Sequence, residues 1–110
     1  MTYISGMIFI ETSIFTKELM KLLSDDEYRA LQHSLVIRPT AGSLIKGTGG
    51  LRKIRWKSYG KGKSGGLRII YYYDPPDKIY MLFPYKKADQ EDLTPTQIKM
   101  LSNLVKELLL

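Results

Sequence analysis

Residues 51–84 read LRKIRWKSYGKGKSGGLRIIYYYDPPDKIYMLFP and predict three β-strands joined by short turns. In the first strand, Leu51 to Lys57, apolar and basic side chains alternate, so the apolar ones would face a core and three cations would project from the other face. The next strands run from Leu67 to Tyr73 and from Lys78 to Pro84, with a reversal at Asp74-Pro75-Pro76-Asp77. Such short connections predict an antiparallel meander.

The segments on either side of this sheet predict an α+β fold. Met7 to Ile10 is short, apolar and partly β-branched, which suits a first strand, and Ser13 is the expected cap of a helix that runs to about Leu23 with helical spacing. Ser24-Asp25-Asp26-Glu27 has the form of a capping box for a second helix, whereas the glycine-rich Thr40 to Gly50 predicts a loop. Thr94-Pro95-Thr96-Gln97 predicts the start of a C-terminal helix. We therefore expect an N-terminal strand and a helical hairpin packed on an antiparallel sheet, with a C-terminal helix.

Length and composition predict one globular domain over residues 1–110. The hydrophobic fraction of 44% is high enough for a folded core. The chain has no cysteine, which excludes disulfides and thiolate metal sites. It shows neither a signal-peptide pattern nor an apolar run near the ~18 residues that a membrane span needs. These features predict a soluble cytoplasmic protein without membrane association.

The basic residues are strongly segregated along the chain. Tyr28 to Tyr73 contains ten Lys or Arg residues and no Asp or Glu, whereas the rest of the chain holds seven basic and eleven acidic residues. Like charges crowded together repel each other, so such a block favours a polyanionic partner, most commonly a nucleic acid. A basic face kept for solubility is the weaker alternative, because solubility does not require the exclusion of every acid from the block.

Three basic and aromatic motifs resemble the RelE-type toxins of bacterial toxin–antitoxin modules. They are Leu51-Arg52-Lys53-Ile54-Arg55-Trp56, Gly66-Leu67-Arg68-Ile69-Ile70-Tyr71-Tyr72 and Leu82-Phe83-Pro84-Tyr85-Lys86-Lys87. Asp92-Leu93-Thr94 followed by Gln97 is similar to the C-terminal signature of the HigB branch of that superfamily. The resemblance covers nearly the whole chain. It implies a RelE-like fold and a ribosome-dependent endoribonuclease that cuts mRNA in the decoding site and is inhibited by a cognate antitoxin, expected to be a HigA-like helix-turn-helix protein.

The resemblance also implies four catalytic positions, all of them basic. They are Lys53 and Arg55 on the first strand of the meander, Arg68 on the next strand, and Lys87 at the end of the last strand, with Lys86 as the less favoured alternative to Lys87. The chain departs from the family at two positions. RelE-type enzymes have a lysine where Arg55 stands, and their C-terminal tyrosine, which stacks on the substrate base, falls here on Leu93.

Basic side chains alone suit the cleavage of RNA without a metal or other cofactor. In that reaction the 2′-OH attacks the adjacent phosphorus, and the protein removes a proton, stabilises the phosphate charge and protonates the leaving 5′-oxygen. Arginine matches phosphate oxygens with its planar fork but stays protonated and cannot act as the base. A lysine among other cations can act as the base, which leaves Lys53, Lys57 and Lys87 as candidates. For Lys53, phosphate contact and proton abstraction remain equally open.

Further residues are candidates for RNA contacts or for a metal site. Lys61 and Lys63 lie in the glycine-rich turn, where contact with phosphate is the favoured role. One tyrosine of the run 71–73 would lie on the cationic face and could stack a base. Asp89, Glu91 and Asp92 are better explained as helix-dipole partners than as magnesium ligands, so no metal site is predicted. The predicted RNA-binding residues are Arg52, Lys57, Lys61, Lys63, Lys86 and Tyr72.

The sequence leaves two classes of function open. The first is an mRNA interferase whose partners are the ribosome, mRNA and an antitoxin. The second is a non-catalytic binder, either a gyrase inhibitor of the ParE branch or a basic nucleic-acid-binding module. The basic set Lys53, Arg55, Arg68 and Lys87 favours the nuclease, because ParE-like members generally lack a full basic set at these positions.

Overall fold

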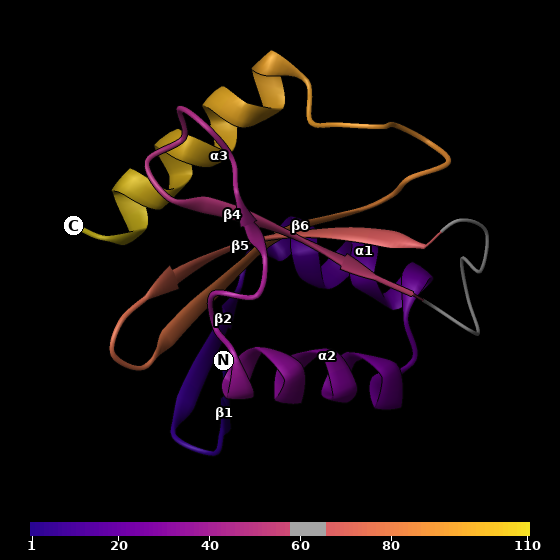
Figure 1. Cartoon of the computed structure of the whole chain (residues 1–110), viewed down its shortest axis with the longest axis vertical. Coiled ribbons are helices and arrows are strands. Elements are labelled where there is room, and N and C mark those ends of the chain that lie inside the picture. Colours follow the sequence, from indigo (N-terminus) through magenta and orange to yellow (C-terminus); the bar gives the residue numbers. More distant parts are fainter. Residues whose placement is uncertain (58–65) are drawn as a thin grey trace.

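The computed structural model describes residues 1–57 and 66–110, and this part of the chain forms three helices on a six-stranded mixed sheet (Figure 1). The predicted α+β class is therefore confirmed. None of these helices is both long and apolar enough to cross a membrane. In chain order the elements are β1 (Thr2–Ile4), β2 (Met7–Glu11), α1 (Ser13–Leu22), α2 (Asp25–Ile37), β3 (Ser43–Leu44), β4 (Leu51–Trp56), β5 (Leu67–Asp74), β6 (Lys78–Lys86) and α3 (Pro95–Leu108).

The predicted meander forms the middle of the sheet, whose strand order is β1-β2-β6-β5-β4-β3. β4 pairs antiparallel with β5, and β5 pairs antiparallel with β6. The prediction missed how the N-terminal strand joins the sheet: β2 pairs in parallel with β6, with Phe9 opposite Ile79. It also missed β1, which forms a hairpin with β2 through Ser5 and Gly6, both at positive φ. The expected loop from Thr40 to Gly50 contains the short strand β3, which pairs with β4.

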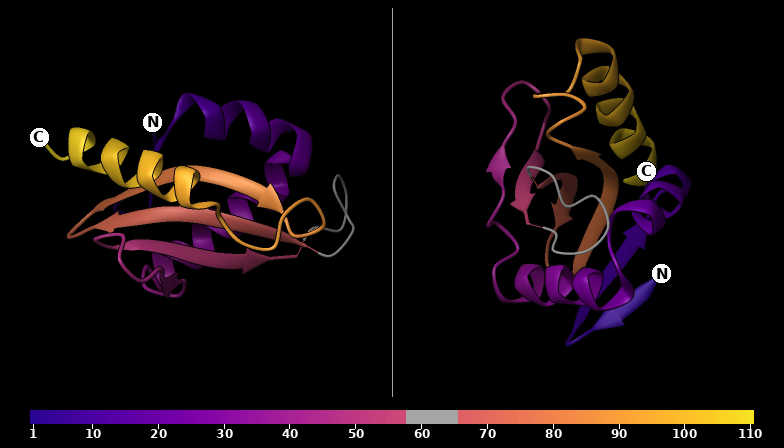
Figure 2. Two further views of the ribbon diagram at one scale, coloured as in Figure 1. Left: turned by 90° about the horizontal axis from the view of Figure 1, so that it is seen from above. Right: turned by 90° about the vertical axis from the view of Figure 1, so that its right-hand side faces the viewer.

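The sheet is covered on both faces, so each strand of the meander contributes to two separate cores. α1 and α2 pack on one face over a cluster that includes Phe9, Leu31 and Ile69. α3 packs on the opposite face over Ile70, Leu82 and other residues. Figures 1 and 2 show α2 and α3 on opposite sides of the strands. α3 leaves part of this face uncovered, because Arg55 on β4 is exposed.

The helices begin at the predicted capping motifs, with one shift. Ser24 with Glu27 and Thr94 with Gln97 form the two capping boxes. Helix α1, however, is capped by Thr12 instead of Ser13, which is its first helical residue. The Thr12 hydroxyl accepts a hydrogen bond from the backbone N–H of Phe15 and donates one to the carbonyl oxygen of Leu82 at 2.8 Å. This second bond ties the start of α1 to β6.

A buried tyrosine fixes the segment after α2 against the sheet. The Tyr71 hydroxyl donates to the carbonyl oxygen of Pro39 at 2.7 Å and accepts from the backbone N–H of Gly42 at 2.9 Å. A Cβ atom at Gly42 would lie 2.8 Å from the Tyr71 ring and 3.0 Å from the carbonyl oxygen of Lys53, which explains the glycine. The contact sets the path of the chain into β3 and so the outer edge of β4.

Candidate functional site

The three predicted cations of β4 and β5 lie on one face of the sheet. On β4, Ile54 and Trp56 pack against the core under α1 and α2, as the alternation predicted. Lys53 and Arg55 therefore project from the opposite face, the one that also carries α3. On β5, Arg68 is the direct cross-strand partner of Arg55, so its side chain lies on that same face. We call Lys53, Arg55 and Arg68 the cationic face.

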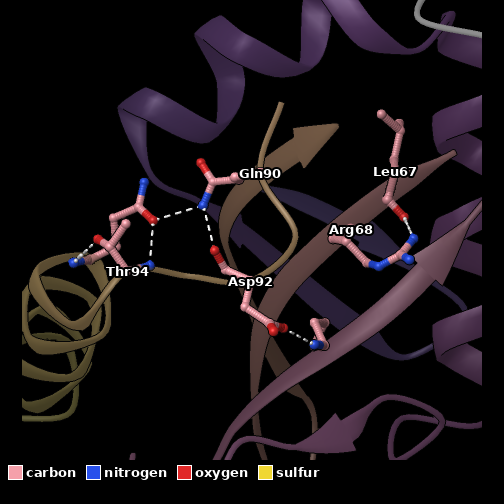
Figure 3. A network of polar contacts seen from close by, with 7 residues as sticks. Leu67, Arg68, Gln90, Asp92 and Thr94 are labelled. Atoms are coloured by element: carbon pink, nitrogen blue, oxygen red, sulfur yellow. Dashed lines mark hydrogen bonds and ion pairs between the residues drawn. The ribbon is translucent and has the colours of Figure 1, made fainter. Parts of the chain in front are cut away.

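Arg68 is the buried member of the cationic face, with 7% of its surface exposed. Its Nη1 donates to the carbonyl oxygen of the neighbouring Leu67 at 3.3 Å (Figure 3). Within the described residues it makes no ion pair. A guanidinium group has five N–H donors, and among residues 1–57 and 66–110 only this one bond of Arg68 is formed. Burial fixes the side chain, and its remaining donors suit a phosphate group.

An acidic side chain from the connection between β6 and α3 reaches the cationic face. Lys53 Nζ lies 2.9 Å from Asp92 Oδ1, and the two side chains are 28% and 71% exposed. The hydrogen bond and charge of Lys53 hold the pKa of the Asp92 carboxyl below its usual range, and Arg68 adds to this effect. Asp92 was expected from the sequence to be a helix-dipole partner, and its pairing with Lys53 across 39 positions of the chain was not predicted.

The segment that presents Asp92 is held by a small polar network at the start of α3 (Figure 3). Gln90 Nε2 donates to the carbonyl oxygen of Asp92 at 3.0 Å and to Gln97 Oε1 at 2.9 Å. The same Gln97 oxygen accepts from the backbone N–H of Thr94 within the capping box. The side chains of Gln90 and Gln97 therefore link the capping box of α3 to the residue that pairs with Lys53.

Tyr85 is a further side chain at this site that the sequence reasoning did not single out. It is the cross-strand partner of Arg68 on β6, which puts Arg55, Arg68 and Tyr85 in one row across three adjacent strands. Only 5% of Tyr85 is exposed, and burial raises the pKa of its hydroxyl, as does the charge of Asp92, while Arg68 lowers it. Its position opposite Arg68 depends on the strand register, for which the sequence gives no direct signal.

Lys87 lies one residue beyond the end of β6. Its side chain is exposed, and its backbone N–H donates to the carbonyl oxygen of Gly66 at 3.3 Å, next to the start of β5. Lys57 is exposed just after β4. Both residues therefore lie at the end of the sheet where Arg55 and Arg68 project. The predicted contacts Lys61 and Lys63 lie outside the described residues.

Three of the predicted RNA contacts are not part of the cationic face. Arg52 lies on the α2 side of β4, where its Nη1 donates to the carbonyl oxygens of Gly42 at 2.8 Å and of Thr40 at 3.3 Å. Lys86 pairs with Leu67, whose side chain belongs to the core under α1 and α2. Tyr72 shares a face with Arg68 but packs against Tyr80, with ring centroids 6.5 Å apart, and lies four residues along β5. Arg52 thus has a structural role in holding the segment before β3.

The acidic residues before α3 do not gather into a metal site. Among residues 1–57 and 66–110, no group of three or more His, Asp or Glu side chains is close enough to hold a metal ion. Asp92 instead faces Lys53, and Leu93, where the family has its base-stacking tyrosine, packs in part against the core under α3. The polar groups that the structure brings together are thus cations, one carboxylate and one phenol.

A comparison with protein families agrees with this arrangement. The model described as "RelE toxin of RelE / RelB toxin-antitoxin system" matches residues 36–110, the part of the chain from the end of α2 through α3. The chain belongs to the RelE toxin family. As a toxin of such a system, it has an antitoxin as its partner. The match includes every residue of the cationic face, together with Tyr85 and Asp92.

Proposed function

We propose that this toxin is a ribosome-dependent mRNA endoribonuclease, close to the HigB branch of the family. The observation that carries the proposal is the row of Arg55 and Arg68 on neighbouring strands, with Lys53 beside them on the same face. Two arginines opposite each other are unfavourable for the isolated sheet, because like charges in a cross-strand pair repel. A phosphate group bound between them removes that cost.

The proposed chemistry is attack of the ribose 2′-OH on the adjacent phosphorus, without a metal or other cofactor. Arg68 and Arg55 stabilise the charge that develops on the phosphate oxygens, the task for which a guanidinium group is best suited. Neither can remove the proton from the 2′-OH, because arginine stays protonated. Lys53 and Lys87 are the candidates for that step, and each is equally suited to a phosphate contact.

The surroundings of the cationic face support a large RNA partner. A hollow of about 550 Å³ lies along β4 and is lined by residues that include Ser43, Lys53 and Arg55. Because no complete acid–base pair is evident on this face, ribosomal RNA is proposed to help orient the message. This function assigns the toxin to the cytoplasm, where mRNA is translated.

The antitoxin is proposed to be an acidic, HigA-like helix-turn-helix protein. One route of inhibition is an acidic segment laid across Lys53, Arg55 and Arg68. The pairing of Lys53 with Asp92 supports this route, because it is an example of a carboxylate bound at the face. The other route is a partner that grips the hairpin of α1 and α2 and bars the toxin from the ribosome by bulk. We favour the first route slightly.

Primer extension on messages from cells that express the toxin tests the proposal. The expected result is new 5′ ends inside reading frames, absent from cells that express the Arg68→Ala variant. A lack of new ends together with DNA gyrase poisoning would assign the toxin to the ParE branch. A lack of both would leave a basic nucleic-acid-binding module as the better account.

A further inference from the structure

The Tyr85 hydroxyl is a buried polar group without a hydrogen-bond partner among the described residues. The hydroxyls of two other tyrosines, by contrast, have hydrogen-bond partners. Tyr71 bonds to Pro39 and Gly42, and Tyr28 donates to Glu11 at 2.7 Å. A buried hydroxyl that makes no such bond destabilises the fold, so its presence requires another explanation.

The ring of Tyr85 is held rigidly, which fixes the direction of its hydroxyl. It stacks on Phe83 with ring centroids 5.9 Å apart and an angle of 28° between the ring planes. It also belongs to the core under α3. The hydroxyl cannot be explained as the tip of a mobile surface side chain, because only 5% of the residue is exposed.

The charged groups that act on this hydroxyl are Arg68 of the cationic face and Asp92. Tyr85 is paired with Arg68 across β5 and β6, and both Arg68 and Asp92 are close enough for their charges to act on the phenol. Burial and the Asp92 carboxylate raise the pKa of Tyr85, so the phenol keeps its proton at neutral pH. A neutral phenol beside a guanidinium group is a hydrogen-bond donor in a cationic setting. Its natural acceptor is an anionic oxygen.

We infer that Tyr85 is a further catalytic residue, whose hydroxyl donates a hydrogen bond to a non-bridging oxygen of the scissile phosphate bound at Arg68. The inference rests on the proposed nuclease function. In the structure the Tyr85 hydroxyl is buried, and the exposed Asp92 carboxylate is paired with Lys53. The incoming phosphate takes the place of that carboxylate, and Arg68 and Tyr85 then bind it together.

The test replaces Tyr85 by phenylalanine, which removes one oxygen atom and keeps the ring that stacks on Phe83. The matched control is Tyr80→Phe, on the same strand and in the same core, with 7% of Tyr80 exposed. Cleavage by purified toxin is measured on ribosomes that carry a defined message, with toxin at saturation, and thermal unfolding is measured in parallel. We expect the cleavage rate of Tyr85→Phe to fall by roughly 10²-fold, as on loss of one donor to a developing oxyanion. Its unfolding temperature should not fall.

A phosphorothioate at the cleaved position identifies the atom involved. If the Tyr85 hydroxyl binds one non-bridging oxygen, sulfur at that oxygen weakens the same hydrogen bond in the parent toxin. For that diastereomer the fold-decrease in cleavage rate caused by Tyr85→Phe should therefore be smaller. Tyr80→Phe should cleave both diastereomers at the same rates as the parent toxin. If the parent toxin and the Tyr85→Phe variant cleave the message at the same rate, the role assigned to Tyr85 is wrong, whereas the proposed nuclease function stands. A loss of rate that comes with a lower unfolding temperature overturns it in favour of a structural role. A parent toxin that leaves the message intact overturns the nuclease proposal and this inference with it.

Discussion

Arg55 and Arg68 are direct cross-strand partners on β4 and β5, with their side chains on the same face of the sheet. Like charges directly opposite each other on neighbouring strands destabilise a sheet. Neither β4 nor β5 carries an acidic residue before Asp74, and Asp92, from the connection between β6 and α3, forms its ion pair with Lys53. The pair is therefore better explained by what it binds than by what it contributes to the fold.

Arg68→Ala should abolish growth inhibition and leave the fold intact. Loss of one fixed charge donor to the transition state typically lowers the rate ~10²–10³-fold. The control is Arg29→Ala, which removes the same charge from the exposed surface of α2. Growth of cells that express each variant, with circular dichroism of the purified proteins, is the measurement. A folded Arg68→Ala variant that still inhibits growth fully would contradict the role assigned to Arg68.

Asp92→Asn should strengthen binding to RNA, because it releases Lys53 from its carboxylate partner. An added phosphate contact increases the slope of log affinity against log salt concentration by about one. Asp89→Asn is the matched control, since Asp89 is exposed in the same segment and makes no ion pair within the described residues. Binding to a short RNA across a salt series distinguishes the variants. Equal slopes for both would mean that the pair does not compete with RNA.

The ion pair also predicts a specific pH dependence. Because Lys53 lowers the pKa of Asp92 in the folded protein, the pair's contribution to stability is present above the unfolded pKa and is lost as pH falls through the folded value. An NMR titration of the Asp92 carboxyl should therefore give a pKa below the ordinary value of 3.8. In the Lys53→Ala variant most of this shift should disappear. An unchanged pKa in that variant would show that the pair does not form in solution.

Two tyrosine-to-phenylalanine variants should differ in their effect on the stability of the fold. Tyr71→Phe leaves the carbonyl oxygen of Pro39 and the N–H of Gly42 without their partner, which should cost about 1–3 kcal/mol in the free energy of unfolding. Tyr85→Phe removes a hydroxyl that makes no bond within the described residues, so it should cost nothing or stabilise the fold slightly. Urea denaturation measures both. Equal losses would contradict the contrast between the two hydroxyls.

The mode of antitoxin inhibition makes a prediction about binding. If an acidic segment neutralises the cationic face, association should be fast and should weaken steeply with salt. Alanine variants of Lys53, Arg55 and Arg68 should then bind the antitoxin less tightly at low salt. If all three bind as tightly as the parent toxin across the salt series, exclusion from the ribosome by bulk becomes the better account.

Local patterns predicted the elements that build the site. The alternation from Leu51 to Lys57 predicted that Ile54 and Trp56 face a core, although not that Leu51 is buried in the core under α3, and the capping boxes at Ser24 and Thr94 predicted two helix starts. Each of these signals lies within a few residues of the feature it predicts. The shift of the α1 cap to Thr12 shows their limit, because a tertiary bond to Leu82 favours one hydroxyl over its neighbour.

The contacts that the sequence did not reveal all join distant parts of the chain. The parallel pairing of β2 with β6, the ion pair of Lys53 with Asp92 and the position of Tyr85 opposite Arg68 depend on strand order and register. Arg52 was grouped with the RNA contacts by its charge and neighbourhood. Its place on the α2 side of β4 follows from the same alternation that was used for Ile54, and its bonds to the backbone at Thr40 and Gly42 follow from the tertiary fold.

The central claim is that the toxin cuts mRNA on the ribosome with the cationic face. Its most direct test is a reconstituted reaction that contains purified toxin and a defined message, with and without ribosomes, in which the message ends are mapped. We predict cleavage inside the reading frame when ribosomes are translating the message, and its loss in Arg68→Ala. Rapid, specific cutting of the naked message, or an intact message on translating ribosomes, would contradict the account.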